Sequence, residues 1–220
     1  RSPGPARLCL CAAARRSAGS GPVPLADGPV EELVPLLYGN ITKGASTLGS
    51  AGIRVPGSAG ETSEALETSR GVTIKHFACN NQEDHRTGVD ARVSEQALRE
   101  IYLHGFEIAV RTAAPAALMT AYNRINGVQA ANNRELCAVV ARDEWGCDGL
   151  IMSDWNTTVP ADGSKPWRCA AAGNDVIMPG NPHDDADIRA ALADVRLTET
   201  DVRACAGRLM ALTRRLTAGR

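Results

Sequence analysis

A carboxylate stands at the end of an apolar run in the stretch GLIMSDWN, residues 149–156. Leu150–Met152 has the composition of a buried strand, and Asp154 and Trp155 follow shortly after it. A carboxylate in this position can attack an electrophilic carbon, and an indole offers a flat apolar face to a ring-shaped ligand. Asp is also a favoured residue at turns and helix N-caps. The structural interpretation therefore stands beside the chemical one until the neighbourhood of Asp154 is considered.

Polar residues follow other apolar runs in the same way. The four strand-end pairs are Lys75-His76, Tyr122-Asn123, Asp154-Trp155 and Pro179-Gly180. Segments with helical periodicity separate these runs, and apolar strands that alternate with helices pair in parallel beneath the helices. In eight-stranded barrels of this kind, the polar residues at the carboxyl ends of the strands perform the chemistry. We therefore expect these side chains to share one mouth.

Periodicity and capping place the elements that must hold these residues. The expected strands are 72–77, 116–123, 149–155 and 175–180, and the expected helices are 94–110, 134–145, 165–173, 184–195 and one that opens at 198–201. In the first helix Ser94 is the expected N-cap, and the apolar stripe is Ala97, Leu98, Ile101, Tyr102, Ile108 and Ala109. The last helix is expected to bury Val202, Cys205, Leu209, Leu212 and Leu216. The fold class predicted is α/β, a partial TIM (β/α)8 barrel that comprises roughly the C-terminal half, with four parallel strands and covering helices.

Composition excludes several classes of protein. The chain has 220 residues and a formal net charge of −1, which gives no electrostatic basis for binding nucleic acid or an acidic membrane surface. No apolar stretch approaches the roughly 18 residues of a membrane span. Seven scattered cysteines, without metal-ligand spacing, indicate a reducing environment, so we expect a cytoplasmic location and no metal or organic cofactor. Residues 1–28, rich in Pro, Gly, Ala and Arg, are interpreted as a disordered or foreign head, and the first residue, Arg, indicates a fragment or processed product.

One chemistry that fits these groups is retaining glycoside hydrolysis. That reaction needs a carboxylate nucleophile and a second carboxyl group about 5–5.5 Å away. Lys, His and Arg are suitable donors to sugar hydroxyls, but Lys75 and His76 are neighbours and face the same mouth only if the strand ends between them. Each residue also has a structural interpretation. Lys75 would be a strand-end lysine, His76 a core histidine, and Tyr122 a buried ring with a hydrogen-bonded hydroxyl.

Several longer blocks resemble glycoside hydrolase family 3, which contains β-glucosidases and related exo-acting enzymes built on a (β/α)8 barrel. The blocks occur in family order and cover most of residues 71–180, and the tail LTETDVRACAGRLMALTRRL resembles the helix that closes the barrel domain. The blocks are GVTIKHFACNNQEDHR, VSEQALREIYLHGFEIAV, ALMTAYNRINGVQAANN, ARDEWGCDGLIMSDW and AAAGNDVIMPG. The resemblance implies a β-glucoside or oligosaccharide substrate.

The resemblance also implies residue roles. Asp154 matches the catalytic nucleophile that forms the glycosyl-enzyme intermediate. The residues that match ligands of the sugar in the −1 subsite are Lys75, His76, Arg86 and Tyr122, with Trp155 as the flanking aromatic. The nearby Glu83, Asp84 and His85 are interpreted as solvated loop charges.

The sequence departs from the family in two respects. Residues 30–66 resemble the lead-in to the barrel of members whose domain order is permuted, but the chain then passes almost directly to Lys75, so the first half of the barrel is expected to be absent. The family's acid/base Glu belongs to a separate sandwich domain, and the KHFPGHG block of the hexosaminidase branch reads KHFACNNQ here. The expected organisation is a head at 1–28, a lead-in at 29–69 and a partial barrel domain at 70–220.

Three hypotheses follow. The chain is a fragment of a retaining β-glycosidase that is active in its full form, a catalytically inactive remnant with weak sugar binding, or an unrelated barrel enzyme that uses Lys75 as a Schiff-base nucleophile. A half barrel exposes strand edges and apolar helix faces, so self-association is also expected.

Overall fold

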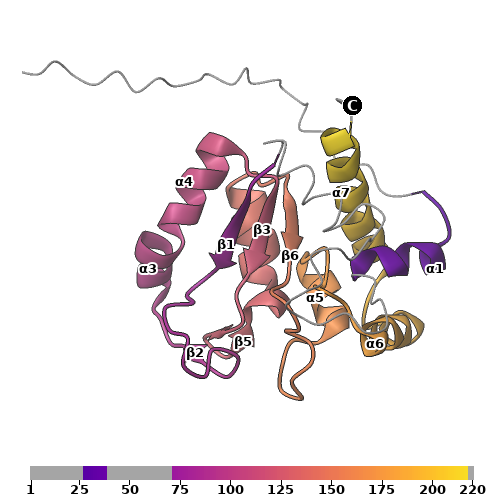
Figure 1. The fold of residues 1–220 in the computed structure, drawn as a ribbon, viewed down its shortest axis with the longest axis horizontal. Helices are drawn as coiled ribbons and strands as arrows, with labels where there is room; N and C mark the ends of the chain where they lie inside the picture. The colour runs from indigo at the N-terminus through magenta and orange to yellow at the C-terminus, as the bar shows by residue number, and fades with distance from the viewer. Residues whose placement is uncertain (1–26, 39–70, 218–220) are drawn as a thin grey trace, which may run out of the picture.

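The computed structural model describes residues 27–38 and 71–217, drawn in colour in Figure 1. The strands are β1 (Thr73–Phe77), β2 (Asp90–Ala91), β3 (Ala117–Thr120), β4 (Arg124–Ile125), β5 (Val128–Gln129) and β6 (Leu150–Met152). The helices are α1 (Val30–Leu33), η1 (Val34–Leu37), α3 (Glu95–Ala97), η2 (Leu98–Tyr102), α4 (His104–Ala113), η3 (Ala130–Asn132), η4 (Glu135–Glu144), α5 (Pro166–Ala172), α6 (Pro182–Ala193) and α7 (Glu199–Thr217). Most of the expected head, and residues 39–69 of the expected lead-in, lie outside these ranges.

A parallel sheet with the order β1-β3-β6 forms the centre of the molecule (Figure 1). Ile74 pairs with Leu118, and Leu118 pairs with Ile151. The expected strand at 175–180 is not a regular strand, because it joins the sheet through single parallel bridges, Val176 to Met152 and Ile177 to Tyr38. The predicted α/β arrangement of parallel strands and helices is therefore confirmed for these residues, while the share of the barrel they represent stays a prediction.

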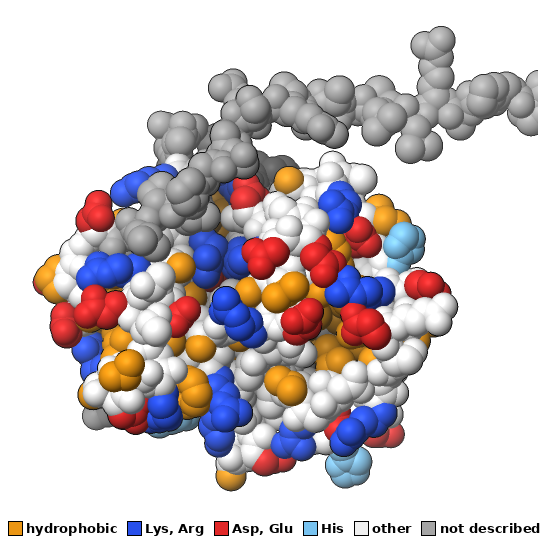
Figure 2. Space-filling model, turned by 180° about the vertical axis from the view of Figure 1, so that it is seen from behind, with side chains coloured by type: hydrophobic (Ala, Val, Ile, Leu, Met, Phe, Trp, Pro, Cys, Tyr) orange, Lys and Arg blue, Asp and Glu red, His pale blue; other side chains and the backbone are white. Residues whose placement is uncertain are grey.

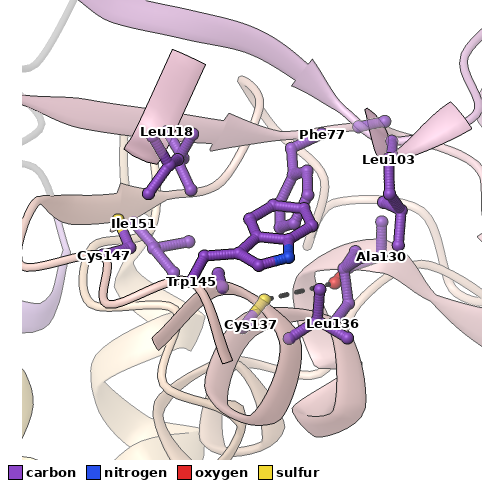
Figure 3. Packing of buried hydrophobic residues seen from close by; sticks show 14 of the residues in the cluster. Phe77, Leu103, Leu118, Ala130, Leu136, Cys137, Trp145, Cys147 and Ile151 are labelled. Atoms are coloured by element: carbon purple, nitrogen blue, oxygen red, sulfur yellow. Dashed lines mark hydrogen bonds between the residues drawn. The ribbon is translucent and has the colours of Figure 1, made fainter. Parts of the chain in front are cut away.

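The helices cover the sheet through an aromatic and aliphatic core, shown in Figure 3. Trp145, which follows η4, lies with its ring centroid 5.8 Å from that of Phe77 at the end of β1. Leu118 and Ile151 from the two neighbouring strands complete this side of the core and are fully buried. Tilted aromatic pairs at such distances contribute about 0.5–1.5 kcal/mol beyond their burial. The core therefore fixes β1, β3 and β6 against η4.

The helical region after Ser94 differs from the prediction. The Ser94 side chain accepts a hydrogen bond from the Ala97 N–H, so the N-cap is confirmed. Ile101 and Ile108, however, expected in the buried stripe, are 68% and 50% exposed. The reason is the π-helical turn η2, whose wider winding shifts the helical phase. Leu98 and Tyr102 pack against the core as predicted, and they are joined there by Leu103, Phe106 and Val110.

The last helix follows the prediction closely. The Asp201 N–H donates to Thr198 Oγ1, and the Thr198 N–H donates to Asp201 Oδ2, which forms a reciprocal cap at the start of α7. All five residues expected to be buried are buried: Val202, Cys205, Leu209, Leu212 and Leu216. They pack against α1, η1, α5 and the sheet, so α7 closes one side of the described fold.

Gly149, just before β6, permits a close approach of two strands. A Cβ atom there would lie 2.7 Å from the Pro115 carbonyl oxygen and 3.0 Å from that of Ala116. We expect Gly149→Ala to lower the free energy of unfolding by about 1–3 kcal/mol, since the backbone must move to relieve the overlap. Urea unfolding measures this loss. The matched control is Gly105→Ala in α4, where a Cβ meets nothing within 4 Å, and it should stabilise the protein by up to about 1 kcal/mol. Equal effects of the two changes would contradict the packing.

In the part of the chain that the structure describes, there is neither a candidate membrane span nor a candidate metal cluster. Figure 2 shows Lys and Arg side chains interspersed with Asp and Glu over the rear face of the molecule. Among residues 27–38 and 71–217, none of the helices has the length and apolar character needed to cross a bilayer. The same residues contain no group of three or more His, Cys, Asp or Glu side chains placed to hold a metal ion.

Candidate active site

Asp154 lies just beyond β6 and is 7% exposed. The Trp155 N–H donates to Asp154 Oδ1 at 2.7 Å, which orients the carboxylate. The Ser153 hydroxyl donates to the Asp154 carbonyl oxygen at 2.8 Å and accepts the Met178 N–H at 2.9 Å. Ser153, which the sequence did not single out, thus ties the turn after β6 to the neighbouring chain segment. The carboxylate is held in place, and 10% of its side chain remains exposed.

His76 is the side chain that lies beside the carboxylate. Its Nε2 is 3.4 Å from Asp154 Oδ2, and its side chain is 30% exposed. The sequence predicted that Lys75 and His76 would share the mouth only if the strand ended between them. This condition is not met, because β1 continues through Phe77. Instead, the pairing of β1 with β3 is irregular between Lys75 and Phe77, and a local irregularity of this kind re-aims a side chain. His76 therefore faces Asp154, whereas Lys75 is exposed and forms no ion pair with the described residues.

Tyr122, from the turn after β3, lies next to the same turn. Its hydroxyl donates to the Trp155 carbonyl oxygen at 2.6 Å. The guanidinium carbon of Arg86 lies 4.7 Å from the centroid of the Tyr122 ring, within range of a cation–π interaction. Burial, followed by the negative charge of Asp154, raises the pKa of Tyr122 to about 12. The hydroxyl thus stays protonated and remains a donor at neutral pH.

Arg86 is held on its other side by an acidic neighbour. Arg86 Nη1 lies 2.7 Å from Glu83 Oε2, and this hydrogen bond is the main cause that raises the pKa of the Arg86 guanidinium. Glu83 is therefore ion-paired, although its side chain is 68% exposed as expected for a solvated loop charge. Asp84 and His85 are exposed, in agreement with the prediction. The structure thus brings His76, Tyr122 and Arg86 together around Asp154 and Trp155.

Replacing Tyr122 by Phe tests the link between β3 and the turn after β6. We expect the free energy of unfolding at pH 7 to fall by about 1 kcal/mol, since the Trp155 carbonyl oxygen loses its donor. The pKa of Tyr122 is raised in the folded state, so its contribution is complete below pH 10 and declines as the pH rises from about 10 to about 12. Urea titrations of both proteins between pH 7 and pH 11.5 measure the difference. A difference that stays constant with pH would contradict this assignment.

The contacts of Asp154 define what the site can do. Within the described residues its carboxylate faces an imidazole, a backbone N–H and the Tyr122 hydroxyl, and no second carboxylate is paired with it. Such a group can act as a nucleophile or stabilise a developing positive charge. In a retaining glycosidase a second carboxyl group protonates the leaving group, and none is among these contacts.

Comparison with known proteins places this site in a family. The sequence pattern of the glycosyl hydrolase family 3 N-terminal domain matches residues 47–212. The chain is 47% identical over 128 residues to an exo-α-(1→6)-L-arabinopyranosidase of Bifidobacterium breve, covering 58% of this chain and 16% of that protein. It is 44% identical over 124 residues to a probable β-glucosidase I of Aspergillus oryzae, covering 56% of this chain and 14% of the relative.

A solved structure shows the same similarity. β-Glucosidase 3B from Thermotoga neapolitana in complex with glucose matches with a TM-score of 0.63 and 39% identity, over 68% of this chain and 22% of that one. The chain thus spans about a sixth of the length of the curated relatives and about a fifth of the solved one. The domain pattern covers well over half of the chain, in the region that holds Asp154, His76 and Tyr122. The chain therefore belongs to glycosyl hydrolase family 3, as part of its N-terminal domain.

Proposed function

We propose that this chain carries the nucleophile and part of the glycone-binding wall of a retaining β-glycosidase that acts on terminal β-D-glucosidic bonds. The observation that carries the proposal is the Asp154 carboxylate, nearly buried at the carboxyl end of β6 and facing His76. In the first step Asp154 attacks the anomeric carbon while the bond to the aglycone oxygen breaks. In the second step water displaces Asp154, and the double displacement retains the β configuration.

The surrounding donors fit the demands of a sugar ring. His76 and Arg86 lie near the nucleophile, and Lys75 is exposed in the middle of β1. We assign these three residues and Tyr122 to the hydroxyls of the sugar in the −1 subsite. Trp155, which is half-buried, is assigned to the apolar face of the ring. Neutral Tyr122 serves as a donor, because its pKa lies far above neutrality.

The leaving group decides which substrates this chain can turn over alone. The described contacts of Asp154 include no second carboxyl group of the kind that protonates the aglycone oxygen in retaining glycosidases. An aglycone such as 2,4-dinitrophenolate leaves without protonation, whereas an alkyl or sugar aglycone does not. We therefore propose activity on activated aryl glycosides, and activity on natural β-glucosides in a longer form that supplies the acid. The domain order of that form, with a sandwich before the barrel, and its cytoplasmic location are part of this proposal.

A second candidate is a catalytically inactive remnant with weak sugar binding. The absence of a second carboxylate among the described contacts of Asp154 favours it for the isolated chain. Both candidates predict the same fold for residues 71–217. They differ in whether Asp154 forms and releases a glycosyl ester.

Hydrolysis of 2,4-dinitrophenyl β-D-glucopyranoside, followed by proton NMR, separates these candidates. The proposal predicts that β-glucose appears first and that mutarotation to the α anomer follows. Release of α-glucose first would overturn the retaining mechanism. No release above the buffer rate, with no thermal stabilisation by glucose, would establish the remnant. The corresponding α-L-arabinopyranoside, run in parallel, tests the glycone, since one relative is named for that sugar.

The exposed edge of the sheet supports a proposal about assembly. Within residues 71–217, β1 pairs only with β3. Three large apolar side chains are exposed in this part of the sequence: Val72 just before β1, Ile101 in η2 and Ile108 in α4. We propose that this side self-associates, because unpaired strand edges and apolar side chains favour association. Light scattering over a range of concentrations tests it, and a monomer at all concentrations would contradict it.

A further inference from the structure

A chain of side-chain contacts runs from the exposed loop after β1 to the turn that carries Asp154. Glu83 Oε2 accepts a hydrogen bond from Arg86 Nη1 at 2.7 Å. The guanidinium carbon of Arg86 lies 4.7 Å from the centroid of the Tyr122 ring. The Tyr122 hydroxyl donates to the Trp155 carbonyl oxygen at 2.6 Å, one residue after Asp154. These three contacts connect Glu83 to the turn that carries Asp154, through Arg86 and Tyr122.

Glu83 is itself fixed at more than one point. Asn80 Nδ2 donates to Glu83 Oε1 at 3.3 Å, so each carboxylate oxygen has its own partner. The Arg86 backbone N–H donates to the Glu83 carbonyl oxygen at 3.3 Å, which closes a short turn between the two residues. The carboxylate and the guanidinium are thus held on one side of the loop.

Arg86 needs such a partner more than its neighbours in the site do. Its side chain is long and nearly half exposed, so that several rotamers are open to it in water. The face of Tyr122 attracts a cation but does not fix its orientation, whereas a carboxylate binds a guanidinium along defined directions. The Glu83 contact therefore decides where the positive charge of Arg86 stands before a ligand arrives.

We infer that Glu83 is a positioning residue for the glycosidase reaction, and that it holds Arg86 over the ring of Tyr122 in the orientation needed to bind the glycone. Glu83 acts through Arg86 and does not touch the sugar. The inference rests on the proposed function for its kinetic consequence, but the contact geometry can be tested without a sugar. Glu83 should affect the binding of the glycone more than the chemical step, because Asp154 and its own contacts are unchanged.

The first test needs no substrate. In the full chain, the Arg86 Nε–H signal in a proton–nitrogen NMR spectrum, identified by its loss in Arg86→Lys, should be shifted upfield by the ring current of Tyr122. In Glu83→Ala this signal should move to the position of a solvent-exposed arginine, and Glu83→Gln, which keeps a neutral acceptor, should give an intermediate position. The control is Asp84→Asn, an exposed acid one residue away, which should leave the signal in place. An unchanged Arg86 signal in Glu83→Ala would overturn the inference.

The second test measures inactivation by 2,4-dinitrophenyl 2-deoxy-2-fluoro-β-D-glucoside. For Glu83→Ala, the concentration that gives the half-maximal rate should rise roughly two- to fivefold, as expected for an exposed ion pair, with little change in the maximal rate. Glu83→Gln should fall between Glu83→Ala and the wild-type protein, and Asp84→Asn should match the wild type. A fall confined to the maximal rate would also overturn the inference. If the wild-type protein is never inactivated, the proposed function fails, while the NMR test still decides the role of Glu83.

Discussion

Asp175→Asn is expected to lower the free energy of unfolding by about 3–5 kcal/mol, because the change leaves buried guanidinium groups without their counter-ion. Asp175 is fully buried, and its two carboxylate oxygens lie 2.7 Å from Arg142 Nη2 and 2.7 Å from Arg208 Nε. Its Oδ2 also accepts the Ile151 N–H from β6 at 2.8 Å. One carboxylate thus joins β6, η4 and α7.

The effect of Asp175 is large because its partners are also buried. Burial by itself would lower the pKa of Arg208. The negative charge and the hydrogen bond of Asp175, together with the contribution of Cys205, outweigh this effect, so that the pKa is raised. Arg142 also donates to the carbonyl oxygen of Gly149, just before β6, and to that of Gly173, just after α5. Loss of the carboxylate therefore weakens several backbone contacts at once.

Urea unfolding, followed by circular dichroism, measures the loss in Asp175→Asn. The matched control is Asp194→Asn, which removes an ion pair with Arg196 that is largely exposed, and it should cost less than about 1 kcal/mol. Equal costs at the two positions would show that the buried network contributes no more than a surface pair.

Asp154→Asn is expected to remove glycosyl transfer almost completely. We expect the rate of dinitrophenolate release to fall by at least about 10⁴-fold, in the range seen when an enzyme loses its nucleophile. The folded state should be little affected, since the Asn side-chain oxygen can still accept the Trp155 N–H. A change of less than about 1 kcal/mol in the free energy of unfolding is therefore expected, and it separates loss of chemistry from loss of folding.

The control for Asp154→Asn is Asp148→Asn, which alters an exposed carboxylate just before β6 and should keep the wild-type rate. Near-wild-type release by Asp154→Asn would mean that another group acts as the nucleophile. Comparable losses in both variants would point to a general effect on the fold.

The sequence predicted the parts of the fold that depend on local pattern. The strands at β1, β3 and β6 are short apolar runs, and the helix after Thr198 begins at a capping box and carries a stripe at helical spacing. Both signals are local and strong. The three strands and the last helix form at the expected places, but β3 and β6 are shorter than the expected strands at 116–123 and 149–155. The strand expected at 175–180 does not form as a regular strand. Only Val176 and Ile177 pair with neighbouring segments, each through one isolated bridge.

The sequence could not predict features that depend on distant contacts. The π-helical turn η2 moved Ile101 and Ile108 from the core to the surface, and no residue type marks such a turn in advance. The hairpin of β4 and β5 was also missed, although its turn at Asn126-Gly127 carries the residues that adopt positive φ. That signal was present and could have identified the hairpin.

The candidate site was predictable to a similar extent. The position of Asp154 at a strand end followed from pattern, and its role followed from the resemblance to a family. The approach of His76 to Asp154 depends on the irregular pairing after Lys75, which the sequence does not reveal. The ion pair between Glu83 and Arg86 could have been predicted from their separation of three residues. It was not predicted, because an exposed charge is as readily solvated by water as paired with another side chain.

The most direct test of the account is to locate a trapped glycosyl group on the chain. After incubation with 2,4-dinitrophenyl 2-deoxy-2-fluoro-β-D-glucoside, digestion and tandem mass spectrometry should place one fluoroglucosyl ester on Asp154, in the peptide that contains GLIMSDWN. Asp154→Asn should carry no such ester. An ester on another carboxylate, or a borohydride-trapped adduct on Lys75, would contradict the assignment of Asp154 as the nucleophile.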